Sequence, residues 1–160
     1  MLLLPEAEKQ IPEIEEVTRV YPVSQMVARH EDRFFREDRI FATDSTFFDF
    51  FDFELKTGDP QTALIQPNSV LITEATAKKY FGDEAAIGKF ITIGEDTEGF
   101  WGKYSSTFQV TGILKNPPHN SHFQFDILTS MPSHPIVKNF DWSWVWRRWR
   151  IRYNRCAVND

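Results

Sequence analysis

Hydrophobic and polar residues alternate in several short stretches of the chain, and this spacing predicts β-strands with one buried face. In Thr107–Leu114 the alternation places Phe108 and Val110 on one face, and residues 123–127 alternate in the same way. Val70–Ile72 is a continuous aliphatic run after a turn, which indicates a short buried strand. Further strands are predicted at residues 53–55 and 90–93, and a hairpin at residues 25–43 with its turn at 31–33.

The residues after Val70–Ile72 have the features of a capped helix. Thr73 is a good N-cap, because its hydroxyl can accept from free N–H groups of the first turn. Ala75–Phe81 is a good helix former, and Gly82 can end the helix in a conformation that other residues rarely adopt. The face predicted to pack on the sheet consists of Ala77, Tyr80 and Phe81, while Lys78 and Lys79 face water.

Two more helices are predicted. Leu4–Val20 has apolar residues at helical spacing and an acidic opposite side, and a short helix is expected to begin near Phe47 with Asp44 or Ser45 as its cap. Its apolar face is predicted to consist of Phe47, Phe50 and Phe51. We interpret the five phenylalanines between Phe47 and Phe53 as core rather than as a binding patch, because large apolar side chains are usually buried. These elements predict an α+β fold, with short β-α-β units and a mixed sheet carrying two to three helices.

Composition narrows the function classes. The chain has 160 residues, of which 41% are hydrophobic, so one domain with its own core is expected. Its net charge of −5 argues against a nucleic-acid partner. Cys156 is the single cysteine, so the chain cannot form an internal disulfide. No apolar run reaches the ~20 residues of a membrane span, and Pro5 and Glu6 interrupt the N-terminal leucines, so we expect a soluble chain without a signal peptide.

Three patterns that could carry chemistry fail on inspection. The stretch Gly82–Lys89 has the glycines and lysine of a phosphate-binding loop, but the glycine spacing is wrong and Phe90 occupies the place of the Ser or Thr that would contact magnesium. His119 and His122 with Asp126 lack the further ligands and the helical spacing of a metal site. No GxSxG nucleophile motif is present. We therefore predict no catalytic, cofactor-binding or metal-binding residues, and no enzyme activity.

Four stretches together resemble a known family. They are IPEIEEVTRV (residues 11–20), FFDFFDFELKTGDPQTAL (47–64), PNSVLITEATAKKYFGDEAAIGK (67–89) and FQVTGILKNPPHNSHFQFDIL (108–128). In order and spacing they are similar to the MacB-like periplasmic core domain of FtsX-type ABC transporter permeases, in the version common in Bacteroidetes. The resemblance covers roughly residues 3–146.

The resemblance implies a non-catalytic domain on the outer side of the inner membrane, between two transmembrane helices of a permease. A separate cytoplasmic ATPase subunit, which the domain does not contact, would drive the motion. The rest of the permease, a second permease copy or a periplasmic protein would be its partners. The resemblance also implies a fragment, because a transmembrane helix and a first strand precede the matching position in the family. The edge left by that strand predicts self-association, or the shift of another segment into the gap.

The C-terminal tail departs from the family pattern. We divide the chain into residues 1–146, the incomplete core domain, and residues 147–160, a tail rich in arginine and tryptophan. The tail could bind an acidic surface or stack on bases, or form a strand with its arginines outward. It could also derive from a reading-frame shift or a cloning remnant.

Two functions therefore follow from the sequence. The first is an extracytoplasmic permease domain that couples membrane motion to export or to a partner. The alternative is a free-standing domain that binds a small ligand or a peptide. A transmembrane helix encoded just upstream would support the first, and a true start and stop would support the second.

Overall fold

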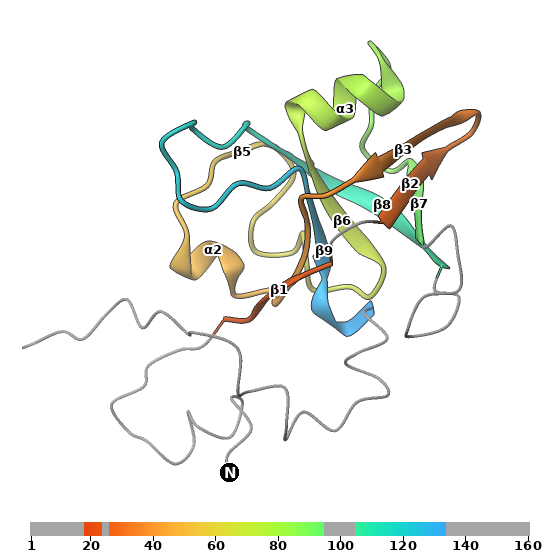
Figure 1. Ribbon diagram of the computed structural model, residues 1–160. Helices are drawn as coiled ribbons and strands as arrows, with labels where there is room; N and C mark the ends of the chain where they lie inside the picture. Colours follow the sequence, from red (N-terminus) through yellow and green to blue (C-terminus); the bar gives the residue numbers. More distant parts are fainter. Residues whose placement is uncertain (1–17, 24–25, 95–104, 134–160) are drawn as a thin grey trace, which may run out of the picture.

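The strands of the computed structural model, which describes residues 18–23, 26–94 and 105–133, form one mixed sheet (Figure 1). Its order is β1-β4-β9-β6-β8-β7-β2-β3, and β5 pairs with β8 outside this path. The strands are β1 (Val20–Pro22), β2 (Met26–His30), β3 (Arg33–Glu37), β4 (Ile40–Thr43), β5 (Leu55–Thr57), β6 (Ser69–Thr73), β7 (Phe90–Gly94), β8 (Ser105–Leu114) and β9 (Ile127–Ser130). The helical elements are α2 (Phe47–Phe50), α3 (Glu74–Phe81) and the 3-10 turn η1 (Met131–Ser133). This arrangement confirms the predicted α+β class with a mixed sheet.

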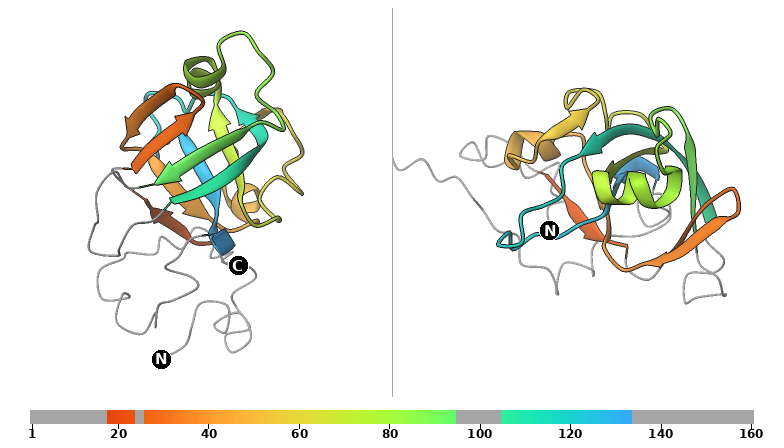
Figure 2. Two further views of the ribbon diagram at one scale, coloured as in Figure 1. Left: turned by 90° about the vertical axis from the view of Figure 1, so that its right-hand side faces the viewer. Right: turned by 90° about the horizontal axis from the view of Figure 1, so that it is seen from above.

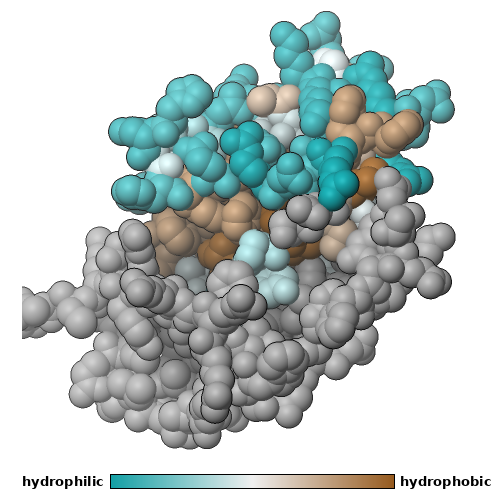
Figure 3. Space-filling view, viewed as in Figure 1, coloured by the Kyte–Doolittle hydropathy of each residue, from teal (hydrophilic) through white to brown (hydrophobic). Residues whose placement is uncertain are grey.

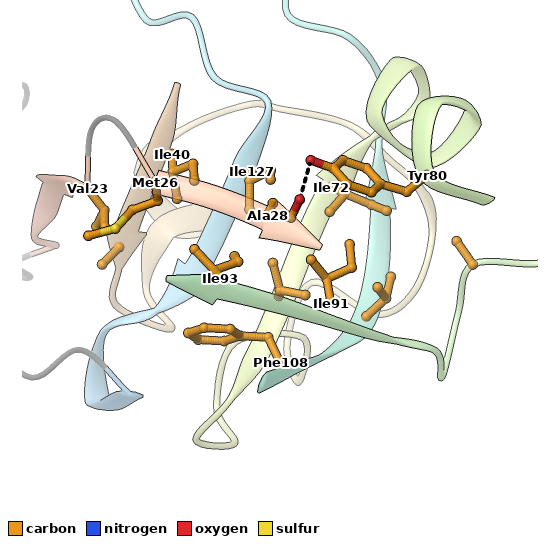
Figure 4. Packing of buried hydrophobic residues seen from close by; sticks show 14 of the residues in the cluster. Val23, Met26, Ala28, Ile40, Ile72, Tyr80, Ile91, Ile93, Phe108 and Ile127 are labelled. Carbon is orange, nitrogen blue, oxygen red and sulfur yellow. Dashed lines mark hydrogen bonds between the residues drawn. The ribbon is translucent and has the colours of Figure 1, made fainter. Parts of the chain in front are cut away.

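The sheet curves strongly. The pairs β4–β9 and β6–β8 are parallel, and the remaining neighbours are antiparallel. In the two views of Figure 2 the strands β7, β2 and β3 turn away from the direction of the central strands. Figure 4 shows the consequence, since β2 and β7 cross over β9 and β6. The curved sheet thereby encloses apolar side chains on its inner face.

The inner face carries the first of two cores (Figure 4). Val70 and Ile72 of β6 point into it, and α3 closes it with Tyr80 and Phe81, which are 1% and 5% exposed. Its other large members are Met26, Ile40, Ile91, Ile93, Phe108, Val110, Ile127 and Met131. The alternation of side chains along a strand explains why β6 serves both faces, because Leu71, between Val70 and Ile72, belongs to the other core.

The second core lies on the outer face of the central strands and is built around Phe47. This side chain is fully buried, and its ring lies between 4.8 and 6.2 Å from five other phenylalanine rings. Those rings belong to Phe48, Phe51, Phe53, Phe123 and Phe125. The interpretation of the phenylalanine group as core is therefore confirmed for all but Phe50, which is 38% exposed.

Helix α3 forms as the sequence predicts. The Thr73 hydroxyl accepts from the N–H of Thr76 at 3.3 Å, which caps the first turn. At the other end, the N–H of Gly82 donates to the carbonyl oxygen of Lys78 at 3.0 Å, with φ of Gly82 at +64°. A positive φ is costly for residues with a Cβ, so glycine is the residue that ends the helix here.

A β-bulge divides β8 into two halves. The register with β6 shifts between Val70 and Leu71, so that no residue of β6 lies directly opposite Thr111. Before the bulge Phe108 and Val110 face the first core, as predicted. After the bulge the even-numbered residues of β8 point to the opposite face of the sheet, so that Leu114 faces the second core.

Several predicted boundaries are wrong, among them that of the strand predicted at residues 53–55, which lies at Leu55–Thr57. Val20 lies in β1 rather than in a helix, because it pairs with Thr43, and the rest of the predicted helix up to residue 17 lies outside the described residues. Residues 123–126 are not in a strand, and β9 begins only at Ile127, where pairing with β4 and β6 starts. The hairpin turn at residues 31–32 is confirmed, but the predicted second strand of the hairpin is two strands. The first is β3, which pairs with β2, and the second is β4, which lies elsewhere in the sheet.

The cap of α2 also differs from the prediction. The N-cap is Thr46, without a side-chain hydrogen bond to the helix. Asp44 is engaged elsewhere, since its carboxylate accepts from Arg19 Nε and Nη2, both at 2.7 Å. This ion pair ties the start of β1 to the end of β4. Residues 95–104 and the tail at 147–160 lie outside the described residues.

Candidate functional site

A cluster of polar and aromatic contacts joins the β2–β3 hairpin to α3. We call it the hairpin–helix junction and define it by Ala28, Arg33, Phe35, Glu37, Lys79 and Tyr80. A two-residue turn brings β3 back beside β2, with Phe35 opposite Ala28. Strand alternation then points Arg33, Phe35 and Glu37 to the inner face of the sheet, where α3 lies.

Glu37 is the centre of the junction. Its side chain is buried, and the residue is 6% exposed. Glu37 Oε1 accepts from the Tyr80 hydroxyl and from Lys79 Nζ, each at 2.7 Å. The Tyr80 hydroxyl also lies 3.3 Å from the carbonyl oxygen of Ala28, a contact drawn in Figure 4. A buried carboxylate is tolerable only when it is paired and hydrogen-bonded, and these two donors meet that requirement.

The junction fixes the protonation of its tyrosine. Burial, the hydrogen bond to Glu37 and the charge of that carboxylate all raise the pKa of Tyr80 far above its ordinary value. Tyr80 therefore stays neutral and acts as a hydrogen-bond donor, which excludes it as a base. The arrangement supports rigid attachment of the hairpin rather than proton transfer.

Further contacts strengthen this attachment. Arg33 Nη1 donates to the carbonyl oxygen of Tyr80 at 3.0 Å, near the negative end of α3. Lys79 Nζ lies 4.4 Å from the centroid of the Phe35 ring, and Phe35 meets Tyr80 edge to face at 5.3 Å. The His30 ring contacts Phe81 at 4.4 Å. The hairpin is held to the helix along its whole length.

The outward face of the same strands carries exposed aromatic residues. Phe34 of β3 and Phe90 of β7 are 67% and 55% exposed. Strand register places both on the side away from α3, since Phe34 is opposite Arg29 and Arg29 is opposite Thr92. Figure 3 shows hydrophobic surface on the hairpin and a second hydrophobic band below α3, next to atoms drawn in grey.

The loop-like stretch Gly82–Lys89 is a turn that packs against β8. The N–H of Gly88 donates to the carbonyl oxygen of Val110 at 2.8 Å, and the N–H of Val110 donates to Lys89 at 2.8 Å. Lys89 also pairs with Glu84, and this contact lowers the pKa of that carboxyl group. The lysine that a phosphate-binding loop would need is therefore engaged within the chain.

The candidate metal ligands are not brought together. His119 and His122 are both exposed. Asp126 accepts from Arg39 Nε and Nη2, at 2.7 and 2.9 Å, so its carboxylate is already paired. Residues 18–23, 26–94 and 105–133 contain no group of three or more His, Cys, Asp or Glu side chains that could hold a metal ion, and Cys156 lies outside these ranges.

Sequence reasoning missed the hairpin–helix junction. It placed Lys79 on the wet side of α3, where the residue is indeed exposed, but it gave Glu37 no role and so did not foresee their pairing. One signal was available, because Glu37 shares a strand face with Phe35, and a carboxylate on an inward face needs a buried donor such as Tyr80.

Comparison with known proteins gives a consistent assignment. The chain matches the model of the MacB-like periplasmic core domain over residues 2–157. No curated protein matches the chain. Within the described residues, no helix is long and apolar enough to cross a membrane.

Three solved structures are similar in fold. A domain of a protein described as a permease, from Porphyromonas gingivalis, has 25% identity and a TM-score of 0.64, over 82% of this chain and 52% of that one. The periplasmic region of MacB from Actinobacillus actinomycetemcomitans has 15% identity and a TM-score of 0.61, over 87% and 58%. The extracellular domain of the ABC-type transporter YknZ from Gram-positive bacteria has 15% identity and a TM-score of 0.56, over 82% and 61%.

This chain thus spans between 52% and 61% of those solved chains. The family match extends over nearly its whole length, and the three solved structures are similar to it in fold. The sequence motifs that suggested a permease domain lie within the matched region. The chain belongs to the family of MacB-like periplasmic core domains.

Proposed function

We propose that this chain is a non-catalytic extracytoplasmic domain that transmits movement of a permease's membrane helices to an exported substrate or to a partner outside the membrane. The family match over residues 2–157 carries the proposal. It favours this function over a free-standing ligand-binding domain, because the solved relatives are parts of transporters.

Rigidity is the physical property that such a role requires, and the structure supports it. One sheet runs through the domain, with a core on each face. Paired charges join segments that lie far apart in sequence, as in Arg39–Asp126 and Arg19–Asp44. A displacement applied at one end of such a body reaches the other end without being absorbed by local bending.

The absence of catalysis is part of the proposal. Tyr80 donates to Glu37, and Asp126 accepts from Arg39, so both side chains serve structure. The energy source would be a cytoplasmic ATPase subunit that the domain does not touch, and the remainder of the permease would be its covalent partner. We assign the core function to residues 1–146 and none to residues 147–160.

Energy transfer from a fluorophore on the domain to an acceptor dye on lipid headgroups tests this proposal in proteoliposomes. The complete permease, with its ATPase subunit, would carry Cys156→Ser and one dye on Lys78→Cys, an exposed position of α3. We expect the transfer efficiency to differ between the nucleotide-free and the vanadate-trapped state, because the domain moves relative to the membrane.

A second pair of dyes supplies the control. Lys78→Cys and Gln61→Cys lie within the domain, both at exposed positions, and their transfer efficiency should stay constant if the domain moves as a rigid body. Equal headgroup transfer in the two states, in a preparation that hydrolyses ATP, would contradict the coupling function.

A further inference from the structure

The outermost strand β3 has an open edge. Within the described residues no strand pairs with its outer side, because β3 stands last in the strand order. Arg33, Phe34, Phe35 and Arg36 are all exposed. We propose that this edge pairs in antiparallel fashion with β3 of a second copy of the chain, centred on Phe35, so that two sheets join across a two-fold axis.

The backbone groups that point outward follow from the hairpin. The turn closes between His30 and Arg33, so this is a hydrogen-bonded pair, and Phe35 with Ala28 is the next. Phe34 and Arg36 lie between these pairs, and their N–H and C=O groups therefore point away from β2. They form a short ladder that can accept another strand.

The opposite end of the described sheet is a poorer edge. It is formed by β1, which has three residues and ends at Pro22, a residue without an N–H. Strand β3 has five residues, no proline and an unbroken register with β2. The sequence predicted self-association at a different sheet edge, whereas the features of the described strands favour β3.

Pairing centred on Phe35 matches hydrogen-bonding type and chemistry. Phe34 of each copy lies opposite Arg36 of the other, and both residues offer outward backbone groups. An arginine opposite a phenylalanine can contact the ring face. Arg33 of each copy lies opposite Glu37 of the other, so that no like charges are placed opposite each other in this register. The strand is therefore self-complementary about its central residue, as a two-fold interface requires.

The neighbouring registers are less favourable. A shift centred on Arg36 would place two arginines directly opposite each other, and like charges across a pair are destabilising. A shift centred on Phe34 would bring the turn residue Asp32 into the ladder opposite Arg36. The register centred on Phe35 uses the five strand residues and leaves the turn outside.

The interface is small, so the isolated chain should dimerise weakly. Pairing of two five-residue edges falls in the class of weak interfaces, below about 1,200 Å² of buried area. Two copies held in one membrane would have a much higher effective concentration. That role in a permease rests on the proposed function, but the pairing itself is testable without transport.

Disulfide trapping of the full chain tests the register. In a Cys156→Ser background, Phe35→Cys places two cysteines in a non-hydrogen-bonded pair, whose Cα atoms lie about 4.5 Å apart. Phe34→Cys is the matched control, because its nearest counterpart would be a diagonal neighbour at about 7–8 Å. Under a glutathione redox buffer we expect disulfide dimers for Phe35→Cys and little for Phe34→Cys. Random collision would favour Phe34→Cys, since Phe34 is 67% and Phe35 is 37% exposed.

Sedimentation velocity with two variants of Arg36 gives a second test that leaves Phe35 intact. Arg36→Pro removes an N–H that points outward and leaves the bonds to β2, whereas Arg36→Ala removes the same side chain but keeps the N–H. At concentrations up to ~1 mM we expect Arg36→Pro to weaken dimerisation at least ~10-fold and Arg36→Ala far less.

The two tests together decide the proposal. Equal or greater cross-linking of Phe34→Cys, or equal association of the two Arg36 variants, would overturn it. A monomer at every concentration, together with no cross-linking of either cysteine variant, would also overturn it. If Phe35→Cys fails to fold by circular dichroism, the Arg36 pair decides alone. None of these results depends on whether the domain couples transport.

Discussion

Removal of the Tyr80 hydroxyl is the most direct test of the hairpin–helix junction. In Tyr80→Phe the ring stays in the first core and the hydroxyl is lost, together with its bond to Glu37 and its longer contact with the carbonyl oxygen of Ala28. The hydroxyl donates at 2.7 Å to a carboxylate on a residue that is 6% exposed, so the lost bond is charge-assisted and shielded from water.

The expected cost follows from these contacts. A hydrogen bond to a charged group contributes about 1.5–3 kcal/mol to stability. Glu37 keeps Lys79 as a second donor, at 2.7 Å, so the carboxylate is not left without a partner. We therefore expect Tyr80→Phe to lower the free energy of unfolding by about 1.5–2 kcal/mol, the lower part of that range.

Urea unfolding measures this loss. The midpoint should fall while the slope with denaturant stays constant, because the surface exposed on unfolding hardly changes. Glu37→Gln and the double variant complete a cycle, and we expect a coupling energy of about 1 kcal/mol between Tyr80 and Glu37. Lys78→Ala, at an exposed position of α3, is the control and should change stability by less than ~0.5 kcal/mol.

Two results would refute the reasoning. One is a loss below ~0.5 kcal/mol for Tyr80→Phe, which would show that the hydroxyl is as well satisfied by water in the unfolded chain. The other is strict additivity of the two substitutions. In either case the junction would be a contact without energetic weight, and rigid attachment of the hairpin would lose its basis.

Three further predictions concern the cores and the pH dependence of stability. Phe47→Ala should cost about 3–5 kcal/mol in urea unfolding, because its ring is fully buried, whereas Phe50→Ala, at a site that is 38% exposed, should cost far less; equal losses would contradict the placement of the second core. Gly112→Ala should lower the melting temperature, at a cost of about 1–3 kcal/mol, because a Cβ there would lie 2.7 Å from Leu71 Cδ2; an unchanged melting temperature would count against this close packing. Above about pH 10 Tyr80 loses its proton in the unfolded chain but keeps it in the folded chain, because folding raises its pKa. The free energy of unfolding should therefore fall as the pH rises. In urea unfolding at a series of alkaline pH values, Tyr80→Phe should show a shallower fall than the parent chain.

Local chemistry in the sequence was enough to predict the unit around β6 and α3. An aliphatic run, a threonine cap and a terminal glycine each act over a few residues, so the strand and the ends of the helix can be predicted without knowing the fold. The hairpin turn and β7 are explained in the same way. The family could also be inferred, since ordered motifs survive in the linear chain.

Boundaries failed where pairing between distant segments decides the structure. Residues 123–127 alternate like a strand, but only Ile127 onward finds neighbours in β4 and β6. Asp44 has the chemistry of a helix cap, yet Arg19 binds it instead. In both cases a tertiary partner competes with a local preference and prevails.

The sequence by itself determined the buried faces of β6 and of the first half of β8, the capped helix α3 and the family. Only the tertiary structure decided how the sheet curves, where the bulge in β8 changes which core Leu114 faces, and which strand stands at the edge of the described sheet. The hairpin–helix junction belongs to this second group. Glu37 and Tyr80 are 43 residues apart, and nothing in a local pattern states that a carboxylate on one strand will meet a hydroxyl on a helix packed across the sheet. Such contacts depend on how whole helices and strands pack against each other. The hydrophobic pattern predicts which elements form, but it does not predict which of them become neighbours.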